Sequence, residues 1–171
     1  ALLSRMKELT KIKKNNPEIT TISFLEYPNL VNALTRKAGK SIVSVRNHMS
    51  TKYKSGVKAL FWNGTIKRLY SKTDQIIVVS KEIKQDLIIN YRINPDKINV
   101  IYNSYPIETI QKLSEEPIED RYKEIFKYPV IITSGRLNKQ KGHWHLIRAF
   151  SEVKKIIKDV KLVFLGEGAL E

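Results

Sequence analysis

Short apolar runs alternate with longer amphipathic stretches along most of the chain. The runs are four to seven residues long and predict β-strands at residues 19–25, 41–46, 74–79, 98–102, 129–132 and 161–165. Between them, apolar residues recur at helical spacing, which predicts α-helices at residues 2–14, 29–37, 57–71, 81–91 and 142–157. Strands that alternate with helices in this way are typical of a parallel sheet with helices on both faces. We therefore predict an α/β fold.

Residues at the ends of the predicted strands are candidates for ligand binding. Right-handed crossovers place the C-terminal ends of parallel strands at one edge of a sheet, and ligands bind at that edge. Polar side chains stand at or just after the ends of four strands: Arg46, Ser80, Asn103 and Arg136. We expect each of them at the functional edge of its own sheet.

The regular alternation stops after residue 103. The next stretch contains Pro106, Pro117 and four acidic residues between positions 115 and 120, a composition that predicts a linker. The simplest organisation is two α/β units, residues 1–105 and 129–171, joined by a crossover at residues 106–128.

Composition indicates a soluble globular protein, with 42% hydrophobic residues and no apolar stretch long enough to span a bilayer. The chain has no cysteine, which excludes disulfides and thiolate metal sites. It begins with Ala1, and its last residues read as a strand end and a turn, so we expect it to be part of a longer protein.

The net charge of +14 favours polyanionic partners, such as nucleic acid, anionic lipid headgroups or phosphorylated small molecules. The basic residues are spread along the chain, and Lys11, Lys13 and Lys14 form the one local cluster. Composition alone does not choose among these partners, and a lysine-rich proteome would give the same charge.

Fixed positive charge lies in the turn between a strand and a helix, in the sequence TSGRLNKQKGHWHLIRAF at residues 133–150. Gly135 and Gly142 let the backbone turn and let a ligand approach the helix start, where unpaired N–H groups point outward. Arg136 can hold two phosphate oxygens, and Lys141 supplies a movable point charge. The turn is either a diphosphate site or a solvated turn, and spacing alone does not decide.

Other phosphate motifs do not fit this sequence. A Walker loop requires the lysine after its second glycine, whereas Lys141 precedes Gly142. A dinucleotide fingerprint after the first strand is lacking, and Gly166-Glu167-Gly168 after the last strand is a lone, weak G-x-G.

Several segments together resemble a known family. VIITSGRLNKQKGHWHLIRAF followed by VKLVFLGEG resembles the start of the C-terminal domain of retaining glycosyltransferases of the GT-B fold, family 4 (glycosyl transferases group 1). Upstream, SKTDQIIVVSKEIKQDL and INPDKINVIYNSYPIE resemble segments that precede this domain in the family. The resemblance runs in order over about residues 19–171. It implies that residues 1–105 are the C-terminal half of the acceptor-side domain and residues 129–171 the start of the donor domain.

The resemblance also implies roles for individual residues. Arg136 and Lys141 match the pair that holds the donor's diphosphate as the sugar leaves, and Gly135 matches the glycine before that arginine. Lys139 is a nearby rival for the lysine role. Gly166 and Gly168 match the turn near the nucleotide, and we expect packing or surface roles for His143 and His145. His48 follows a strand where family members often carry a histidine near the sugar or acceptor, although a lone loop histidine is also often incidental.

The substrates implied are a UDP- or GDP-sugar and a glycan or lipid-linked acceptor, with neither cofactor nor metal and no nucleic acid. The expected process is bacterial surface polysaccharide or glycolipid synthesis in the cytoplasm, including the inner face of the plasma membrane. The basic N-terminal helix either contacts an anionic membrane or covers the sheet with a solvated lysine face. The family's N-terminal glycine loop and E-x7-E segment fall outside the sequence, so we expect an incomplete donor pocket and no activity for this chain alone.

Two alternatives remain open. The charge fits a nucleic-acid-binding module, although the aromatics Phe61, Trp62, Tyr70, Phe150 and Phe164 fall in periodic segments, which favours core positions over exposed stacking platforms. A GT-B-like nucleotide-sugar epimerase would share the sheets and the diphosphate chemistry but not the GR…KG turn.

Overall fold

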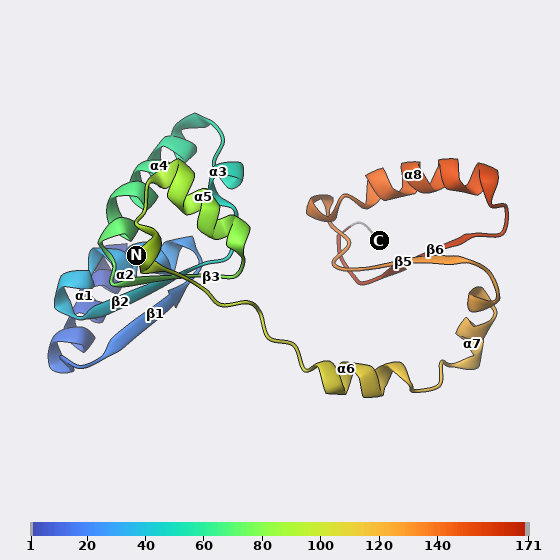
Figure 1. Ribbon diagram of the computed structural model, residues 1–171, viewed down its shortest axis with the longest axis horizontal. Helices are drawn as coiled ribbons and strands as arrows, with labels where there is room; N and C mark the ends of the chain where they lie inside the picture. The colour runs from blue at the N-terminus through green and yellow to red at the C-terminus, as the bar shows by residue number, and fades with distance from the viewer. Residues whose placement is uncertain (1, 170–171) are drawn as a thin grey trace. The chain divides into compact units, whose positions relative to one another are not determined.

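The computed structural model describes residues 2–169 and divides into two compact units, residues 1–105 and 106–171 (Figure 1). Residues 170 and 171, at the end of the predicted donor-side segment, lie outside the described part. Each unit contains a parallel sheet with α-helices, which confirms the predicted α/β class.

In the first unit, the described residues form a sheet of four parallel strands in the order β1-β2-β3-β4. The strands are β1 (Thr20–Phe24), β2 (Lys40–Val45), β3 (Gln75–Val78) and β4 (Ile98–Val100). Each lies within, or one residue beyond, a strand predicted from the apolar runs.

The helices of this unit precede or connect the strands. They are α1 (Leu2–Asn15), α2 (Glu26–Leu34), α3 (Met49–Lys52), α4 (Gly56–Leu69) and α5 (Lys81–Tyr91), with 3₁₀ turns η1 (Arg36–Ala38), η2 (Tyr70–Lys72) and η3 (Pro95–Lys97). The short helix α3 occupies a polar stretch for which the sequence pattern predicted no helix. Ser80 caps α5 as predicted, because its hydroxyl accepts the backbone N–H of Ile83 at 3.3 Å.

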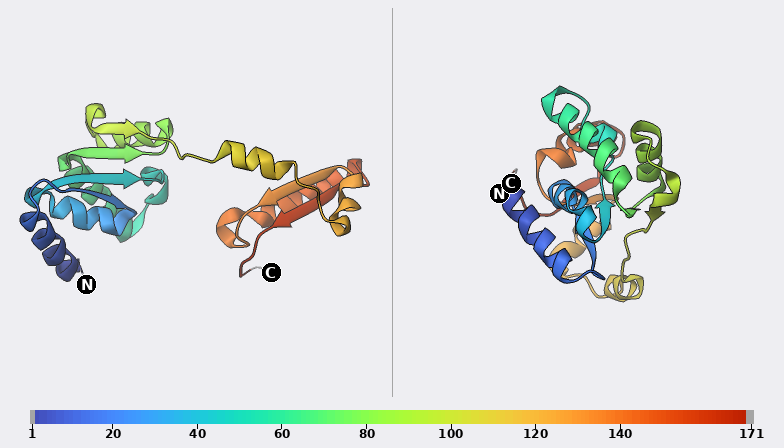
Figure 2. Two further views of the ribbon diagram at one scale, coloured as in Figure 1. Left: turned by 90° about the horizontal axis from the view of Figure 1, so that it is seen from below. Right: turned by 90° about the vertical axis from the view of Figure 1, so that its left-hand side faces the viewer.

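The helices α2, α4 and α5 pack against one face of the sheet, while α1 packs against α2 and α3 packs against α5 (Figure 2). Inward-facing strand residues such as Val43, Ile76 and Val78 are fully buried and form one core with residues of α2, α4 and α5. On the opposite face, Ile22 and Phe24 of β1 are each 51% exposed. The expectation of helices on both faces is therefore wrong for this part of the chain. The strand order explains this, because right-handed crossovers that all step in the same direction place their helices on the same side.

The N-terminal helix also differs from its prediction as a helix with a solvated lysine face. Lys13 is fully buried, and its ammonium group donates to Asn32 Oδ1 at 2.9 Å and to Ser41 Oγ at 2.8 Å. Lys11 and Lys14 are exposed, so the predicted cluster of three lysines presents two charges to solvent. Lys13 instead attaches α1 to α2 and to the start of β2.

The second unit contains the parallel pair β5 (Val130–Ser134) and β6 (Lys161–Leu165), connected through α8 (His143–Ile156). The 3₁₀ turn η5 (Lys139–Lys141) precedes α8. The predicted linker forms the short helices α6 (Ile107–Ser114) and α7 (Asp120–Lys123) and the turn η4 (Ile125–Lys127), and all residues of α6 and α7 are exposed. No helix within residues 2–169 has the length and apolarity needed to cross a membrane.

Candidate functional site

The cationic turn between β5 and α8 is fixed beside the segment that follows β6. The backbone N–H of Gly135 donates to the carbonyl of Leu165 at 2.8 Å, and that of Leu137 donates to Glu167 at 2.9 Å. These two hydrogen bonds continue the parallel pairing beyond the ends of the strands. As a result, residues 135–137 and 166–168 lie side by side, which brings together two motifs that are 31 residues apart in the sequence.

The glycines at 166 and 168 are required by this close approach. A Cβ atom at Gly166 would lie 2.0 Å from the carbonyl oxygen of Gly135, and one at Gly168 would lie 2.3 Å from that of Leu137. Neither position can hold a side chain unless the backbone moves. Gly166 also has a φ of +149°, which disfavours other residues.

Lys141 is brought back toward Gly135 by the turn between them. The side chain of Asn138 accepts the backbone N–H of Lys141 at 3.2 Å, which closes η5, and Gly142 then adopts a φ of +67°. A Cβ placed on Gly135 would lie 3.7 Å from Lys141 Nζ, so the ammonium group lies over the glycine. Gly135 thus leaves room for the lysine side chain.

The cations of this turn are exposed. Arg136, Lys139 and Lys141 all face solvent, and no carboxylate of residues 2–169 comes within 4 Å of any of them. The backbone at Arg136 is held in place, because His143 Nε2 lies 3.1 Å from its carbonyl oxygen and the His143 ring packs edge-on against Phe164. His143 therefore has a packing role. The arrangement is suited to attracting an anion to a fixed backbone position.

In the first unit, His48 follows β2 and is held by an aspartate. His48 Nδ1 lies 3.4 Å from Asp86 Oδ2, whose side chain is fully buried and also accepts the backbone N–H of Met49 at 2.7 Å. The imidazole is partly exposed. Thr51 Oγ1 and Ser50 Oγ also lie 3.2 and 3.4 Å from Nδ1. When Nδ1 carries the proton, it points at three oxygen atoms including that of Asp86, and Nε2 keeps its lone pair.

Asp86 is kept ionised despite its burial. Burial alone raises the pKa of the Asp86 carboxyl, but hydrogen bonds from Ser50 and Asn90 and the nearby His48 outweigh it and hold this pKa below its ordinary value. Asp86 was not among the residues predicted for a site. A signal was present, because Asp86 lies at the helical spacing of Ile83 and Leu87 on the buried face of α5, where a carboxylate is uncommon.

The other predicted edge residues are already engaged within the chain. Arg46 Nη2 donates to Asn103 Oδ1 at 2.7 Å, so the ends of β2 and β4 are linked as expected for residues at one edge. Lys52 and Glu26 form an ion pair at 2.6 Å near the same edge. Residues 2–169 contain no cluster of three histidine, aspartate or glutamate side chains arranged to hold a metal ion.

Comparison with known proteins gives two family matches. The model of a family described as Glycosyltransferase Family 4 matches residues 2–109, and that of Glycosyl transferases group 1 matches residues 115–171. The curated relatives include an uncharacterized glycosyltransferase, MJ1059, of Methanocaldococcus jannaschii, which is 38% identical over 133 residues. This match covers 77% of the chain and 33% of the relative.

A second relative is named for its reaction. It is the N-acetylgalactosamine-N,N'-diacetylbacillosaminyl-diphospho-undecaprenol 4-alpha-N-acetylgalactosaminyltransferase of Campylobacter jejuni, 34% identical over 165 residues, with 94% of this chain and 43% of the relative covered. The chain thus spans between a third and a half of the length of these two relatives. Among solved structures, a glycosyltransferase from Rickettsia africae matches 90% of the chain and 41% of its own length with a TM-score of 0.56. At 24% identity, this match concerns the fold alone.

Proposed function

This chain belongs to Glycosyltransferase Family 4, and we propose that its protein transfers a sugar from a nucleoside-diphosphate donor to an acceptor. The observation that carries the proposal is the cationic turn, where Arg136 and Lys141 are exposed next to a backbone fixed by hydrogen bonds. We assign residues 129–171 to the donor side and residues 1–105 to the acceptor side. The family match favours this activity over an epimerase or a nucleic-acid-binding module.

Arg136 and Lys141 would act on the leaving group. When the bond between sugar and diphosphate breaks, negative charge grows on the phosphate oxygens. Cations fixed in advance at that position stabilise the transition state more than the ground state. The planar guanidinium of Arg136 can contact two oxygens, whereas Lys141 can follow the charge as it develops. Gly135 would make room for Lys141 over the turn, and Gly166 and Gly168 would hold the segment after β6 against the turn, beside the nucleotide.

His48 is our candidate on the acceptor side. Its Nε2, freed by the contact between Nδ1 and Asp86, is available to hydrogen-bond a hydroxyl of the sugar or of the acceptor. Asp86 would act as a positioning residue, because it reaches a substrate only through the imidazole.

The finer features of the reaction follow the family. We propose a UDP- or GDP-sugar donor, retention of the anomeric configuration and no requirement for a metal or another cofactor. The name of the Campylobacter relative includes a diphospho-undecaprenol, which supports a lipid-linked acceptor. This favours glycolipid or surface polysaccharide synthesis on the cytoplasmic side of a bacterial membrane.

Titration of the full-length protein that contains this chain with UDP and GDP tests the diphosphate site. Arg136→Ala and Lys141→Ala should each weaken binding by roughly tenfold or more, since a hydrogen bond to a charged group contributes about 1.5–3 kcal/mol. Lys139→Ala is the matched control, because Lys139 is an equally exposed cation of the same turn. If Lys139→Ala weakens binding as much as Lys141→Ala, the lysine assignment is wrong. If none of the three changes affinity, the turn is not the donor site.

A further inference from the structure

The helix α4 carries apolar side chains on two opposite sides. Its inner side contributes Ala59, Trp62 and Ile66 to the core. Its outer side presents Val57, Leu60 and Phe61, which are 86%, 78% and 55% exposed. Phe61 was predicted as a core residue, and its exposure is a correction to that prediction. α4 therefore exposes apolar side chains to solvent in addition to those that it buries in the core.

The outer side chains form a continuous stripe, which we call the α4 stripe and define as Val57, Leu60 and Phe61. Positions three and four apart are neighbours on a helix surface, so these residues lie together near the N-terminal end of α4. Isolated exposed apolar residues are normal on soluble proteins, but a contiguous group indicates an interaction surface.

The charge around the stripe has one sign. Residues 27–73 contain ten lysines and arginines and no aspartate or glutamate. Lys54, Lys58, Lys67 and Arg68 are exposed near or along α4, and no carboxylate of the described chain lies within 4 Å of them. On a helical projection, Lys58 and Lys67 flank the stripe on its two sides. An apolar centre with a cationic border complements an anionic bilayer.

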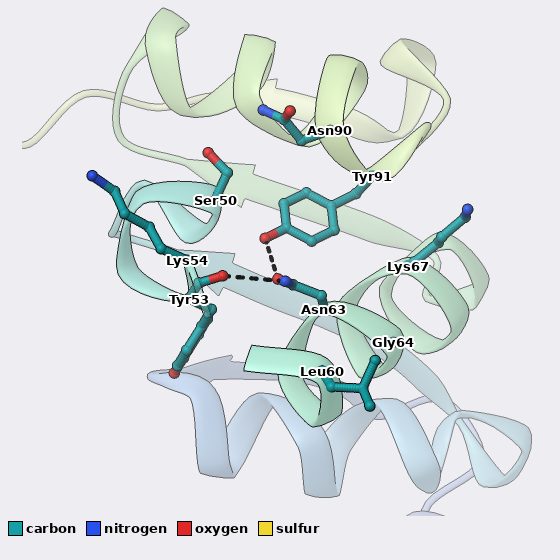
Figure 3. A pocket seen from close by; sticks show the side chains of 9 residues that line it. All are labelled: Ser50, Tyr53, Lys54, Leu60, Asn63, Gly64, Lys67, Asn90 and Tyr91. Carbon is teal, nitrogen blue, oxygen red and sulfur yellow. Dashed lines mark hydrogen bonds between the residues drawn. The ribbon is translucent and has the colours of Figure 1, made fainter. Parts of the chain in front are cut away.

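A hollow of about 520 Å³ adjoins the stripe between α4 and α5. Leu60 lines it, and the side chains of Lys54 and Lys67 stand at opposite sides of it (Figure 3). Its base is polar and rigid, because Tyr91 donates to Asn63 Oδ1 at 2.7 Å and Asn63 donates to the Tyr53 carbonyl at 3.2 Å. The hollow has room for a polar headgroup beside the apolar stripe.

We propose that the α4 stripe and its flanking lysines dock the protein onto an anionic phospholipid bilayer, with the apolar side chains in the acyl region and the lysines at lipid phosphates. This deepens the proposed function, since it supplies a route to a lipid-linked acceptor. It also relocates the membrane contact that the sequence suggested for α1. That helix buries Lys13 and carries Glu8 among its exposed residues, which weakens its attraction for an anionic surface.

Co-sedimentation of the full chain with vesicles tests this docking. One set contains equal parts of phosphatidylcholine and phosphatidylglycerol, and the other contains phosphatidylcholine alone. Binding should require the anionic lipid and weaken as salt is added. The double variant Leu60→Ser/Phe61→Ser should lower the partition coefficient at least tenfold. Lys54→Gln/Lys67→Gln should lower it by about fivefold for each lysine at low salt.

Two further variants serve as comparisons. Ile156→Ser/Lys158→Gln makes the same kinds of change at exposed residues of the second unit, and it should leave vesicle binding unchanged. Leu3→Ser/Lys7→Gln on α1 should have a much smaller effect than the α4 variants. Equal binding to both vesicle types overturns the proposal. The proposal is also wrong if the α1 variant loses vesicle binding and the α4 variants keep it. If the α4 variants lose binding to random duplex DNA and not to vesicles, the partner is nucleic acid and the proposal is wrong.

Vesicle binding is measured without a donor, so it separates the two proposals. If the full-length protein that contains this chain binds vesicles through α4 but transfers no sugar, the docking is supported and the proposed function is contradicted. If that protein transfers sugar to a soluble acceptor but does not bind vesicles, the proposed function is supported and the docking is contradicted.

Discussion

The buried amine of Lys13 leads to our most detailed prediction. Its Nζ donates to Asn32 Oδ1, to Ser41 Oγ and to the Thr35 carbonyl at 2.9, 2.8 and 3.5 Å, and the residue is fully buried. No carboxylate of residues 2–169 lies within 4 Å of this amine. It therefore depends on neutral acceptors, and burial lowers its pKa below the ordinary value of 10.5, with Asp74 opposing that change.

Two substitutions separate the packing of the side chain from its charge. Lys13→Ala removes about three buried methylene groups at roughly 0.8 kcal/mol each and leaves Ser41 and the Thr35 carbonyl short of a donor, at about 1–3 kcal/mol. Removal of the buried charge offsets part of this destabilisation, so we expect Lys13→Ala to lower the free energy of unfolding by about 2–4 kcal/mol. Lys13→Met keeps most of the side-chain volume, and we expect it to lose roughly 1–2 kcal/mol less than Lys13→Ala.

The pH dependence has a definite sign. Because the pKa of Lys13 is lower in the folded chain, the folded state binds fewer protons than the unfolded state between that pKa and 10.5. Its contribution to stability therefore rises with pH in that window. Tyr70 and Tyr91 act in the opposite direction, since burial raises the pKa of both. The difference between wild type and Lys13→Met isolates the lysine from these tyrosines.

Urea unfolding followed by the fluorescence of the buried Trp62 measures these changes. Lys14→Met is the control, because Lys14 is exposed on the same helix; it should change the unfolding free energy by less than about 0.5 kcal/mol. The predicted role of Lys13 is wrong if Lys13→Ala is as stable as wild type or if Lys13→Met is as unstable as Lys13→Ala. The lowered pKa of Lys13 is contradicted if the stabilities of wild type and Lys13→Met depend on pH in the same way up to pH 10.

Three further predictions each concern a contact within one of the two units. Gly168→Ala should disrupt the pairing of residues 135–137 with 166–168, because its Cβ would lie 2.3 Å from the Leu137 carbonyl oxygen; unchanged amide exchange at Leu137 would contradict this. Asp86→Asn should cost about 2 kcal/mol near neutral pH. Since the pKa of Asp86 is lowered, that difference should vanish in acid as pH falls through its folded value. A constant difference down to pH 2 would refute this account. Ser80→Ala should cost about 1 kcal/mol in urea unfolding through loss of the α5 cap, whereas Ser80→Thr should cost less.

The elements that follow one clear periodicity could be predicted from the sequence. The strand at residues 161–165 and the helix at 81–91 have the expected bounds, because apolar spacing and an N-cap serine determine them locally. The side of the sheet that each helix covers depends on strand order, which periodicity does not contain. The burial of Lys13 could not be predicted either, because its acceptors are 19 to 28 residues away in the sequence.

In the candidate site, too, some features could be predicted from the sequence and others could not. The spacing of Gly135, Arg136 and Lys141 left open an anion site or a solvated turn, and it could not show that residues 166–168 lie beside them. That contact depends on the pairing of β5 with β6. The position of His48 was visible in the sequence, whereas its attachment to Asp86 requires α3 and α5 to pack together. Which residues adjoin a site therefore depends on tertiary structure even where the residue types are evident.

The difference between the two sheet edges argues for the donor site in the second unit. At the edge of the first sheet, Arg46 is bonded to Asn103 and Lys52 to Glu26, so an incoming anion would have to break existing contacts. At the cationic turn, the described residues supply no carboxylate for Arg136 or Lys141. The attraction of these two cations is therefore available to a ligand without the cost of replacing an internal partner. A diphosphate, which carries charge on adjacent phosphoryl groups, gains more from such a pair than a monoanion does. UDP should consequently bind more tightly than UMP, and Arg136→Ala should reduce that preference.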